Sequence, residues 1–369
     1  MKLIDIIKHI EDFAPLALQE SWDNSGLILG DRDQEIKSIM VCLDVTETVL
    51  NEAIEKGCNL ILSHHPIIFK GIKKLTENNS DQRILRKAIK NDIAIYAAHT
   101  SLDNAKEGIN SFLAKKLGLK NISILAPKED CLFKIVTYVP NSHADIVRDA
   151  MFKAGAGNIG NYNACSYNLE GTGTFKAQED TNPFVGNIGE MHFENEVRIE
   201  TITPKHLLSN VIRELIASHP YEEPAYDVFQ THIQWNQAGL GVVGELENAV
   251  EEEEFFQHLK TTFHLSAFRR SPRLGKKVKK IAICSGSGAD FITRAKAAHA
   301  DAYLSGDISY HRFFEHDDKM LIIDIGHAET ELPTKELFCY ELSKRINGIQ
   351  VIASANEVPP MQFESYTEQ

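Results

Sequence analysis

Residues 59–66 read Asn-Leu-Ile-Leu-Ser-His-His-Pro, a short apolar run that ends in two adjacent histidines. The run Leu60 to Leu62 is typical of a buried strand, and similar runs lie on either side of it in the chain, at Ser38 to Leu43 and Ile93 to Ala98. Between these runs lie segments that are polar on one face and apolar on the other, which is typical of helices. These segments are Thr46 to Lys56 and Ser80 to Asn91. The alternation of strands and helices predicts an α/β domain.

The same alternation returns near the end of the chain, after a middle region of a different kind. Strands are expected at Lys280 to Cys284, Ala302 to Leu304 and Met320 to Ile325, and a helix at Thr334 to Arg345. In the middle we expect the order βαββαβ, the ferredoxin-like pattern. Its segments are Lys134 to Val139, Ala144 to Ala154, Tyr162 to Leu169 with Gly173 to Ala177, Val197 to Thr203, Lys205 to Ser218 and Ala225 to Gln230.

A region that is complete in itself, with similar patterns before and after it, is most simply a domain inserted at an exposed loop. We therefore expect residues 1–126 and 236–369 to form one α/β domain. Residues 127–235 form the insertion, with junctions near Pro127 to Asp130 and Gln234 to Gly241.

Composition narrows the class of protein. The 369 residues include 52 acidic and 39 basic side chains, and the net charge of −13 argues against nucleic acid as the main partner. No apolar stretch approaches the roughly 20 residues that a membrane-spanning helix needs, and the N-terminal segment is expected to be an amphipathic helix. The six cysteines are scattered without a CxxC pair, as expected of reduced core residues. We expect a cytoplasmic protein.

Polar clusters follow three of the expected strands where each strand ends. They are Ser63-His64-His65-Pro66, His99-Thr100-Ser101-Leu102-Asp103 and Gly326-His327-Ala328-Glu329-Thr330-Glu331. Ligands of open α/β sheets gather at the carboxyl ends of strands, so we expect these clusters to meet. His327 and Glu331 are four residues apart and share one face of a helical turn. Taken singly, each cluster also fits a plain interpretation as loop histidines, a helix-capping aspartate or a chance pair.

Together the clusters supply three imidazoles and two carboxylates: His64, His65, Asp103, His327 and Glu331. This set suits zinc, our first candidate, or Mn, Fe or Co better than Ca or Mg, which prefer oxygen ligands. Five ligands cannot saturate two ions unless a carboxylate bridges them, and open positions are typical of a catalytic site. Two carboxylates leave two divalent ions with a surplus of about two positive charges, which favours a bound hydroxide and an anionic or carbonyl substrate.

Each of the other polar residues and segments allows two interpretations. His99 is either a metal ligand or a group that orients one, and His99 and His311 are candidates for proton transfer. Asp307 and His311, four residues apart after an expected strand, could lie beside the metal ligands, and they fit a capping aspartate and a surface histidine about equally. The backbone amides of residues 285–288 could hold an anion, although the spacing matches no nucleotide motif. The basic stretch 269–280 could steer a phosphorylated substrate or form a solvated loop.

The motifs, taken in order, resemble those of the GTP cyclohydrolase 1 type 2 homologue family, also called NIF-three-like. They are Trp22-Asp23-Asn24-Ser25-Gly26-Leu27, the three clusters above, and Gly306-Asp307. The middle region, with Gly157-Asn158-Ile159-Gly160-Asn161-Tyr162 and His219-Pro220-Tyr221-Glu222-Glu223-Pro224-Ala225-Tyr226, is similar to the inserted PII-like domain of long members.

The resemblance implies an NIF-three-like α/β core and two divalent metal ions per chain. The ions would be held by His64, His65, Asp103, His327 and Glu331, with Glu331 bridging. It also implies a ring-shaped homohexamer with the inserted domains near its openings. The family name implies GTP or a related nucleotide as substrate.

Two function classes follow. The first is a metal-dependent hydrolase in which a metal-bound hydroxide attacks a purine ring or a related cyclic amide, which for GTP would be C8 of guanine. The second is not an enzyme but a metal-responsive regulator, a metal chaperone or an assembly scaffold. A chaperone should release its metal readily to a chelator, whereas a catalytic site should retain it and turn over substrate.

Overall fold

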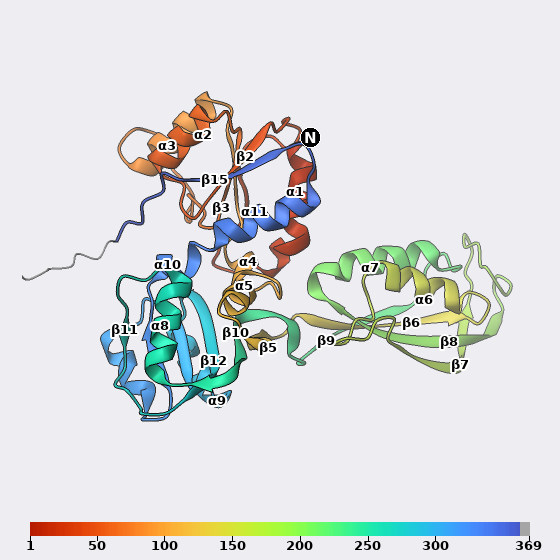
Figure 1. Cartoon of the computed structure of the whole chain (residues 1–369). Helices are drawn as coiled ribbons and strands as arrows, with labels where there is room; N and C mark the ends of the chain where they lie inside the picture. Colours follow the sequence, from red (N-terminus) through yellow and green to blue (C-terminus); the bar gives the residue numbers. More distant parts are fainter. Residues whose placement is uncertain (362–369) are drawn as a thin grey trace, which may run out of the picture. The chain divides into compact units, whose positions relative to one another are not determined.

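The computed structural model describes residues 1–361 and divides into two compact units (Figure 1). Unit 1 combines Met1–Pro127 with the chain from Gln237 onward, and unit 2 comprises Lys128–Asn236. Among the described residues, no helix is long and apolar enough to cross a membrane. All six cysteines lie in this part of the chain and are free, and Cys42, Cys58 and Cys284 are buried.

The first sheet of unit 1 has five strands. Its order is β1 (Gly26–Leu29), β4 (Ala94–Ala97), β3 (Leu60–Ser63), β2 (Ser38–Cys42) and β15 (Gln350–Ala353). All neighbours are parallel except the pair of β1 and β4. Helices cover both faces, which explains why the central strands are continuously apolar.

The side chains of β2 alternate between two cores. Ile39 and Val41 pack with apolar residues of α1 (Leu3–Phe13) and α11 (Thr334–Arg345). Met40 and Cys42 pack with residues of α2 (Glu47–Glu55) and α3 (Ser80–Lys90). The expected strands at 38–43, 60–62 and 93–98 and both expected helices between them are confirmed to within two residues at each end.

The second sheet of unit 1 has six strands. Its order is β11 (Arg269–Arg270), β14 (Leu321–Asp324), β13 (Ala302–Gly306), β12 (Val278–Ser287), β10 (Trp235–Val250) and β5 (Lys120–Lys128). β12, β13 and β14 are parallel, and they correspond to the three strands expected near the end of the chain. Residues of α8 (Glu252–Phe263) pack in the core on one face, and residues of α9 (Ile292–Ala297) pack on the other.

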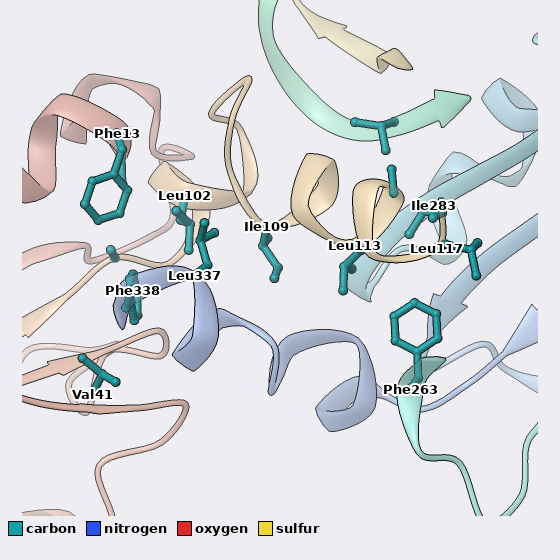
Figure 2. Close-up of a cluster of buried hydrophobic side chains, with 14 of the residues drawn as sticks. Phe13, Val41, Leu102, Ile109, Leu113, Leu117, Phe263, Ile283, Leu337 and Phe338 are labelled. Carbon is teal, nitrogen blue, oxygen red and sulfur yellow. The ribbon is translucent and has the colours of Figure 1, made fainter. Parts of the chain in front are cut away.

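One buried cluster joins the two sheets of unit 1 (Figure 2). It includes residues of α1 and α11 beside the first sheet and residues of α8 and β12 of the second. Ile109 and Leu113 of α5 (Ile109–Lys116) belong to the same cluster. The remaining short elements are η1 (Leu16–Leu18), α4 (Thr100–Asp103), η2 (Ala289–Phe291), η3 (Tyr310–His316) and α10 (His327–Glu331). The shared core makes the two separated chain segments one packed unit.

Unit 2 contains four strands and two helices in the order βαββαβ. They are β6 (Leu132–Pro140), α6 (Ala144–Lys153), β7 (Ser166–Lys176), β8 (Met191–Pro204), α7 (Lys205–Ser218) and β9 (Tyr226–Thr231). The sheet order is β7-β8-β6-β9 and all neighbours are antiparallel. The helices α6 and α7 lie together on one face of this sheet (Figure 1).

One expectation for unit 2 is wrong, because the two strands expected at 162–169 and 173–177 form the single strand β7. The expected break lay at residues 170–172, all of which belong to the strand. Gly173, within the strand, provides room for a neighbour. A Cβ atom at this position would collide with the carboxylate of Glu196 on the paired strand β8.

Candidate metal centre

The candidate site of unit 1 lies where parallel strands of both sheets end. β3 is followed directly by His64 and His65, and β4 is followed by His99 and by α4, which ends at Asp103. β14 leads through Gly326 into α10, which begins at His327 and ends at Glu331. The carboxyl ends of parallel strands are the usual binding edge of such sheets.

The five side chains expected to bind metal converge around Glu331. Its Oε2 lies 2.9 Å from Nε2 of His65 and 2.9 Å from Nε2 of His327. Its Oε1 lies 3.6 Å from Nε2 of His64, and the same nitrogen lies 3.7 Å from Oδ1 of Asp103. The carboxylate of Glu331 is therefore placed between three imidazoles, and Asp103 lies beside one of them.

Two groups of three side chains bring their ligand atoms within 4.8 Å of one another among the described residues. One group is His65, His327 and Glu331, and the other is His64, His65 and His99. His65 belongs to both. His99, which the sequence leaves open as a ligand or a proton-transfer residue, thus faces the same centre as the expected ligands.

The histidines after β3 are held by their Nδ1 atoms. Nδ1 of His64 lies 2.9 Å from the carbonyl oxygen of Ala98, and Nδ1 of His65 lies 2.9 Å from Oδ1 of Asp44. In both cases Nε2 is left to face the centre. Such a partner at the second ring nitrogen fixes the orientation and the tautomer of a metal-binding imidazole.

Two more carboxylates hold the other imidazoles in the same way. Oδ2 of Asp307 lies 2.7 Å from Nδ1 of His327, and Oδ1 of Asp23 lies 2.8 Å from Nδ1 of His99. Asp307 thus acts on a histidine of the cluster, in line with the interpretation that placed it near the site. Asp23 also accepts from the hydroxyls of Ser25 and Thr100, which fixes its carboxylate.

Sequence reasoning gave no role to Asp44 and none to Asp23 beyond its place in a family motif. A signal for Asp44 was present, because it follows the end of β2, which neighbours β3 in the sheet. The rule that selected the three clusters applies to it equally. Asp23 lies before β1 in a loop, so no strand end pointed to it.

Unsatisfied polar atoms show that the site fits a metal. Nε2 of His64 and Oε2 of Glu331 are buried and have no hydrogen-bond partner among the described residues. Oε2 of Glu331 lies 2.9 Å from two imidazole nitrogens, yet neither contact has hydrogen-bond geometry. Ligand atoms about 2.1 Å from one ion lie about 3.0 Å apart at right angles and about 3.4 Å apart in a tetrahedron, so the spacings of 2.9 to 3.7 Å in this cluster suit coordination. A buried polar atom without a partner is otherwise costly.

The histidine pKa values reflect the crowding of acids and imidazoles. Burial lowers the pKa of His65, but its contacts with Asp44 and Glu331 outweigh burial and raise it to about 10. The contact with Glu331 raises the pKa of His327 to about 9, against the effect of burial and with a further contribution from Asp307. Protonated imidazoles thus supply the positive charge that metal ions would supply, and metal binding must displace these protons.

The two carboxylates of the cluster are shifted in opposite directions. Burial acts to raise the pKa of Glu331, but the surrounding imidazoles hold it well below its ordinary value. Burial dominates at Asp103 and raises its pKa. Glu331 therefore remains an anion at neutral pH, as a metal ligand must.

The absence of a side chain at Gly286 leaves room for the carboxylate of Glu331. Gly286, a buried residue near the end of β12, has φ +61°, and a Cβ atom there would collide with Oε1 of Glu331. Its amide donates to Oγ1 of Thr330, one residue before the glutamate. The end of β12 is therefore shaped around the carboxylate.

Three of the four backbone amides at residues 285–288, where the sequence allowed an anion site, have internal partners. The amide of Ser285 donates to Oδ1 of Asn110, and the amide of Gly288 donates to Oγ of Ser305. With Gly286 bound to Thr330, these amides already have internal partners. Part of the basic stretch is also engaged, since Arg269 pairs with Asp324 and Arg273 with Glu253.

A cavity of about 1010 Å³ opens onto the centre. His65, His99, Asp103, His327 and Glu331 line it, and Trp22 and Phe69 contribute aromatic rings. The rings of Trp22 and Phe69 lie 5.8 and 5.6 Å from the ring of His99. The volume is that of a small-molecule site, with a few polar groups at one place on its wall.

The structure does not bring His311 to the cluster. This side chain is exposed on η3, stacks on Phe314 at 6.4 Å and contacts Tyr310 edge-on at 5.3 Å. It is absent from the residues that line the cavity. Its role in proton transfer stays a prediction, whereas His99 has the position that such a role requires.

Comparison with known proteins places the chain in a family. Residues 1–360 match the model of Duf34/NIF3 (NGG1p interacting factor 3). The GTP cyclohydrolase 1 type 2 homolog of Halalkalibacterium halodurans is 40% identical over 365 residues, which cover 97% of this chain and 98% of the relative. The Bacillus subtilis protein of the same name is 39% identical over 366 residues, covering 97% of each. The crystal structure of a Bacillus cereus protein related to NIF3 has a TM-score of 0.84 at 37% identity and covers 99% of both chains. The chain therefore belongs to the DUF34/NIF3 family.

Proposed function

We propose that the protein is a metal-dependent hydrolase with a dinuclear centre, and that it acts on GTP or a related nucleotide or cyclic amide. His64, His65, Asp103, His327 and Glu331 would hold two divalent ions, zinc first among the candidates. The observation that carries the proposal is the position of Glu331, whose two oxygens face different histidines. The name of the curated relatives supports GTP as the first substrate to test.

Two divalent ions at this place would supply Lewis acidity and an activated water molecule. The chain's own residues have separate tasks. Asp44 and Asp307 hold the rings of His65 and His327, so that both Nε2 atoms point to one place. His99, held by Asp23, has a free Nε2 beside the cluster and would transfer a proton to or from the substrate.

The cavity supports a small planar substrate. Trp22 and Phe69 lie beside His99 at the wall of the cavity, where a purine ring could stack. The aromatic rings would orient the substrate, and the polar cluster would act on one of its carbon atoms. A hydrolase needs both parts within one cavity.

We also propose the kind of domain that unit 2 forms and the oligomeric state of the protein. We infer that unit 2 is a ferredoxin-like domain of the PII-like kind inserted into an NIF-three-like core. The order of its elements and its antiparallel sheet support this inference. The assembly is proposed to be a homohexamer, and sedimentation velocity of the full chain would test it.

The test of the function is GTP turnover by protein reconstituted with Zn, Mn, Fe or Co in turn. Glu331→Ala is the critical variant, and Glu336→Ala is the matched control, because Glu336 is an exposed partner of Lys116. We expect turnover with at least one metal, its loss together with bound metal in Glu331→Ala, and its retention in the control. Full turnover by Glu331→Ala would refute the proposal. Bound metal without turnover of any nucleotide would favour the metal-handling or regulatory alternative.

A further inference from the structure

Unit 2 contains a cavity of about 800 Å³ that the metal centre does not use. Its floor includes Tyr138 of β6 and Arg198 of β8, which are paired across the sheet. The neighbouring residues Val139 and Ile199 pack in the core beneath α6 and α7. Because side chains alternate along a strand, the floor of the cavity is the sheet face opposite the two helices.

Glu196 is the buried polar group of this cavity. It is 9% exposed, and its Oε1 accepts a hydrogen bond of 2.8 Å from the hydroxyl of Tyr221. Burial, together with this bond, raises the pKa of Tyr221, so the phenol remains a donor. Its Oε2 lies over Gly173 and has no hydrogen-bond donor among residues 1–361. A nearly buried carboxylate oxygen that lines a cavity and lacks a donor is placed to receive one from a ligand.

The remaining walls carry negative charge and aromatic rings. Besides Glu196, the carboxylates that line the cavity are Glu170, Asp180, Glu222 and Glu223. The guanidinium of Arg198 pairs with Glu200 at 2.8 Å and lies over the ring of Tyr138, while its buried Nε has no hydrogen-bond partner among the described residues. This one cation leaves the cavity wall with an excess of carboxylates. The aromatic rings are those of Tyr138, Phe175, Phe184 and Tyr221.

We propose that this cavity binds a small organic cation that carries amine or guanidinium groups. Carboxylates form charge-assisted hydrogen bonds with such groups, and aromatic faces attract them. The negative walls disfavour a nucleotide or another phosphorylated ligand. The volume is that of a small molecule rather than of a single metal ion, which the aromatic rings could not ligate.

The test is isothermal titration calorimetry of the full chain with agmatine and with spermidine as probes. Glu196→Gln keeps the shape of the side chain and removes its charge. Gly173→Ala keeps the charge, but its Cβ displaces the carboxylate. Each should weaken binding by about tenfold or more, because a hydrogen bond to a charged group is lost.

Glu214→Gln is the matched control, since Glu214 is a glutamate of α7 that pairs with Arg213 and lies outside the cavity. It should bind both probes as the unmodified chain does, and circular dichroism should show all three variants folded. Failure of both probes to bind would overturn the proposal, as would equal affinity in all variants, which would indicate unspecific attraction to an acidic protein. Tighter binding of ATP than of either probe would also overturn it.

Discussion

Glu331 lies beside three imidazoles, which follow two different strands. Its Oε1 faces His64, and its Oε2 faces His65 and His327 without hydrogen-bond geometry to either. Asp44 supports this arrangement indirectly, because its carboxylate holds the ring of His65 through Nδ1. We expect Asp44→Asn to weaken zinc binding by roughly 10- to 100-fold, because the ring of His65 loses its anionic partner. Competition with a fluorescent zinc chelator measures the affinity. Asp33→Asn, at an exposed aspartate paired with Lys2, serves as the control and should bind zinc normally; equal affinities in the two variants would contradict the assigned role.

The raised histidine pKa values predict how pH acts on the metal-free protein. His65 and His327 titrate at about 10 and about 9 when folded, above the ordinary value of 6.5. Their stabilising effect is complete below pH 6.5 and is lost as the pH rises through these values, since the folded state binds more protons. The melting temperature of the chelator-treated protein should therefore fall between pH 7 and pH 8.5. His65→Ala should reduce this slope, and a melting temperature that rises with pH over this range would refute the charge assignment.

The end of β12 leaves room for Glu331 only because residue 286 is a glycine. Gly286→Ala should cost about 1 kcal/mol for its positive φ and should also lower zinc affinity, because the Cβ displaces Glu331. Gly275→Ala is a matched control, since Gly275 has φ +65° and no other atom lies within 4 Å of the place that the alanine methyl group would take. Thermal unfolding and zinc titration of both variants separate the two effects. Similar zinc affinity in the two variants would show that the end of β12 does not shape the centre.

The strand ends explain how much of the site could be predicted. Apolar runs identify β2, β3, β4, β12, β13 and β14, and the rule that ligands gather at carboxyl ends brings His64, His65, Asp103, His327 and Glu331 together. Asp44 was missed although the same rule applies to it, since it follows the end of β2. Asp23 was missed because it lies in a loop before β1, and no local pattern encodes its approach to Nδ1 of His99. The break expected at residues 170–172 is absent because β7 pairs continuously with β8 from Ser166 to Lys176.

One buried core joins both sheets of unit 1. Phe338 of α11 is fully buried in the cluster of Figure 2, and its ring lies 6.3 Å from that of Phe13. Phe338→Ala should lower the free energy of unfolding by about 3–5 kcal/mol. Urea titration followed by circular dichroism measures it. Ile89→Ala, at a half-exposed position of α3, should change it by less than about 1 kcal/mol; a comparable loss in both variants would contradict the shared core.

The proposal that unit 1 holds two divalent ions around Glu331 is tested by anomalous X-ray scattering at the zinc edge from crystals of the zinc-loaded protein. We expect two peaks in each chain, both within coordination distance of histidine nitrogens and of the Glu331 carboxylate. A single peak, or peaks away from His64, His65 and His327, would contradict it.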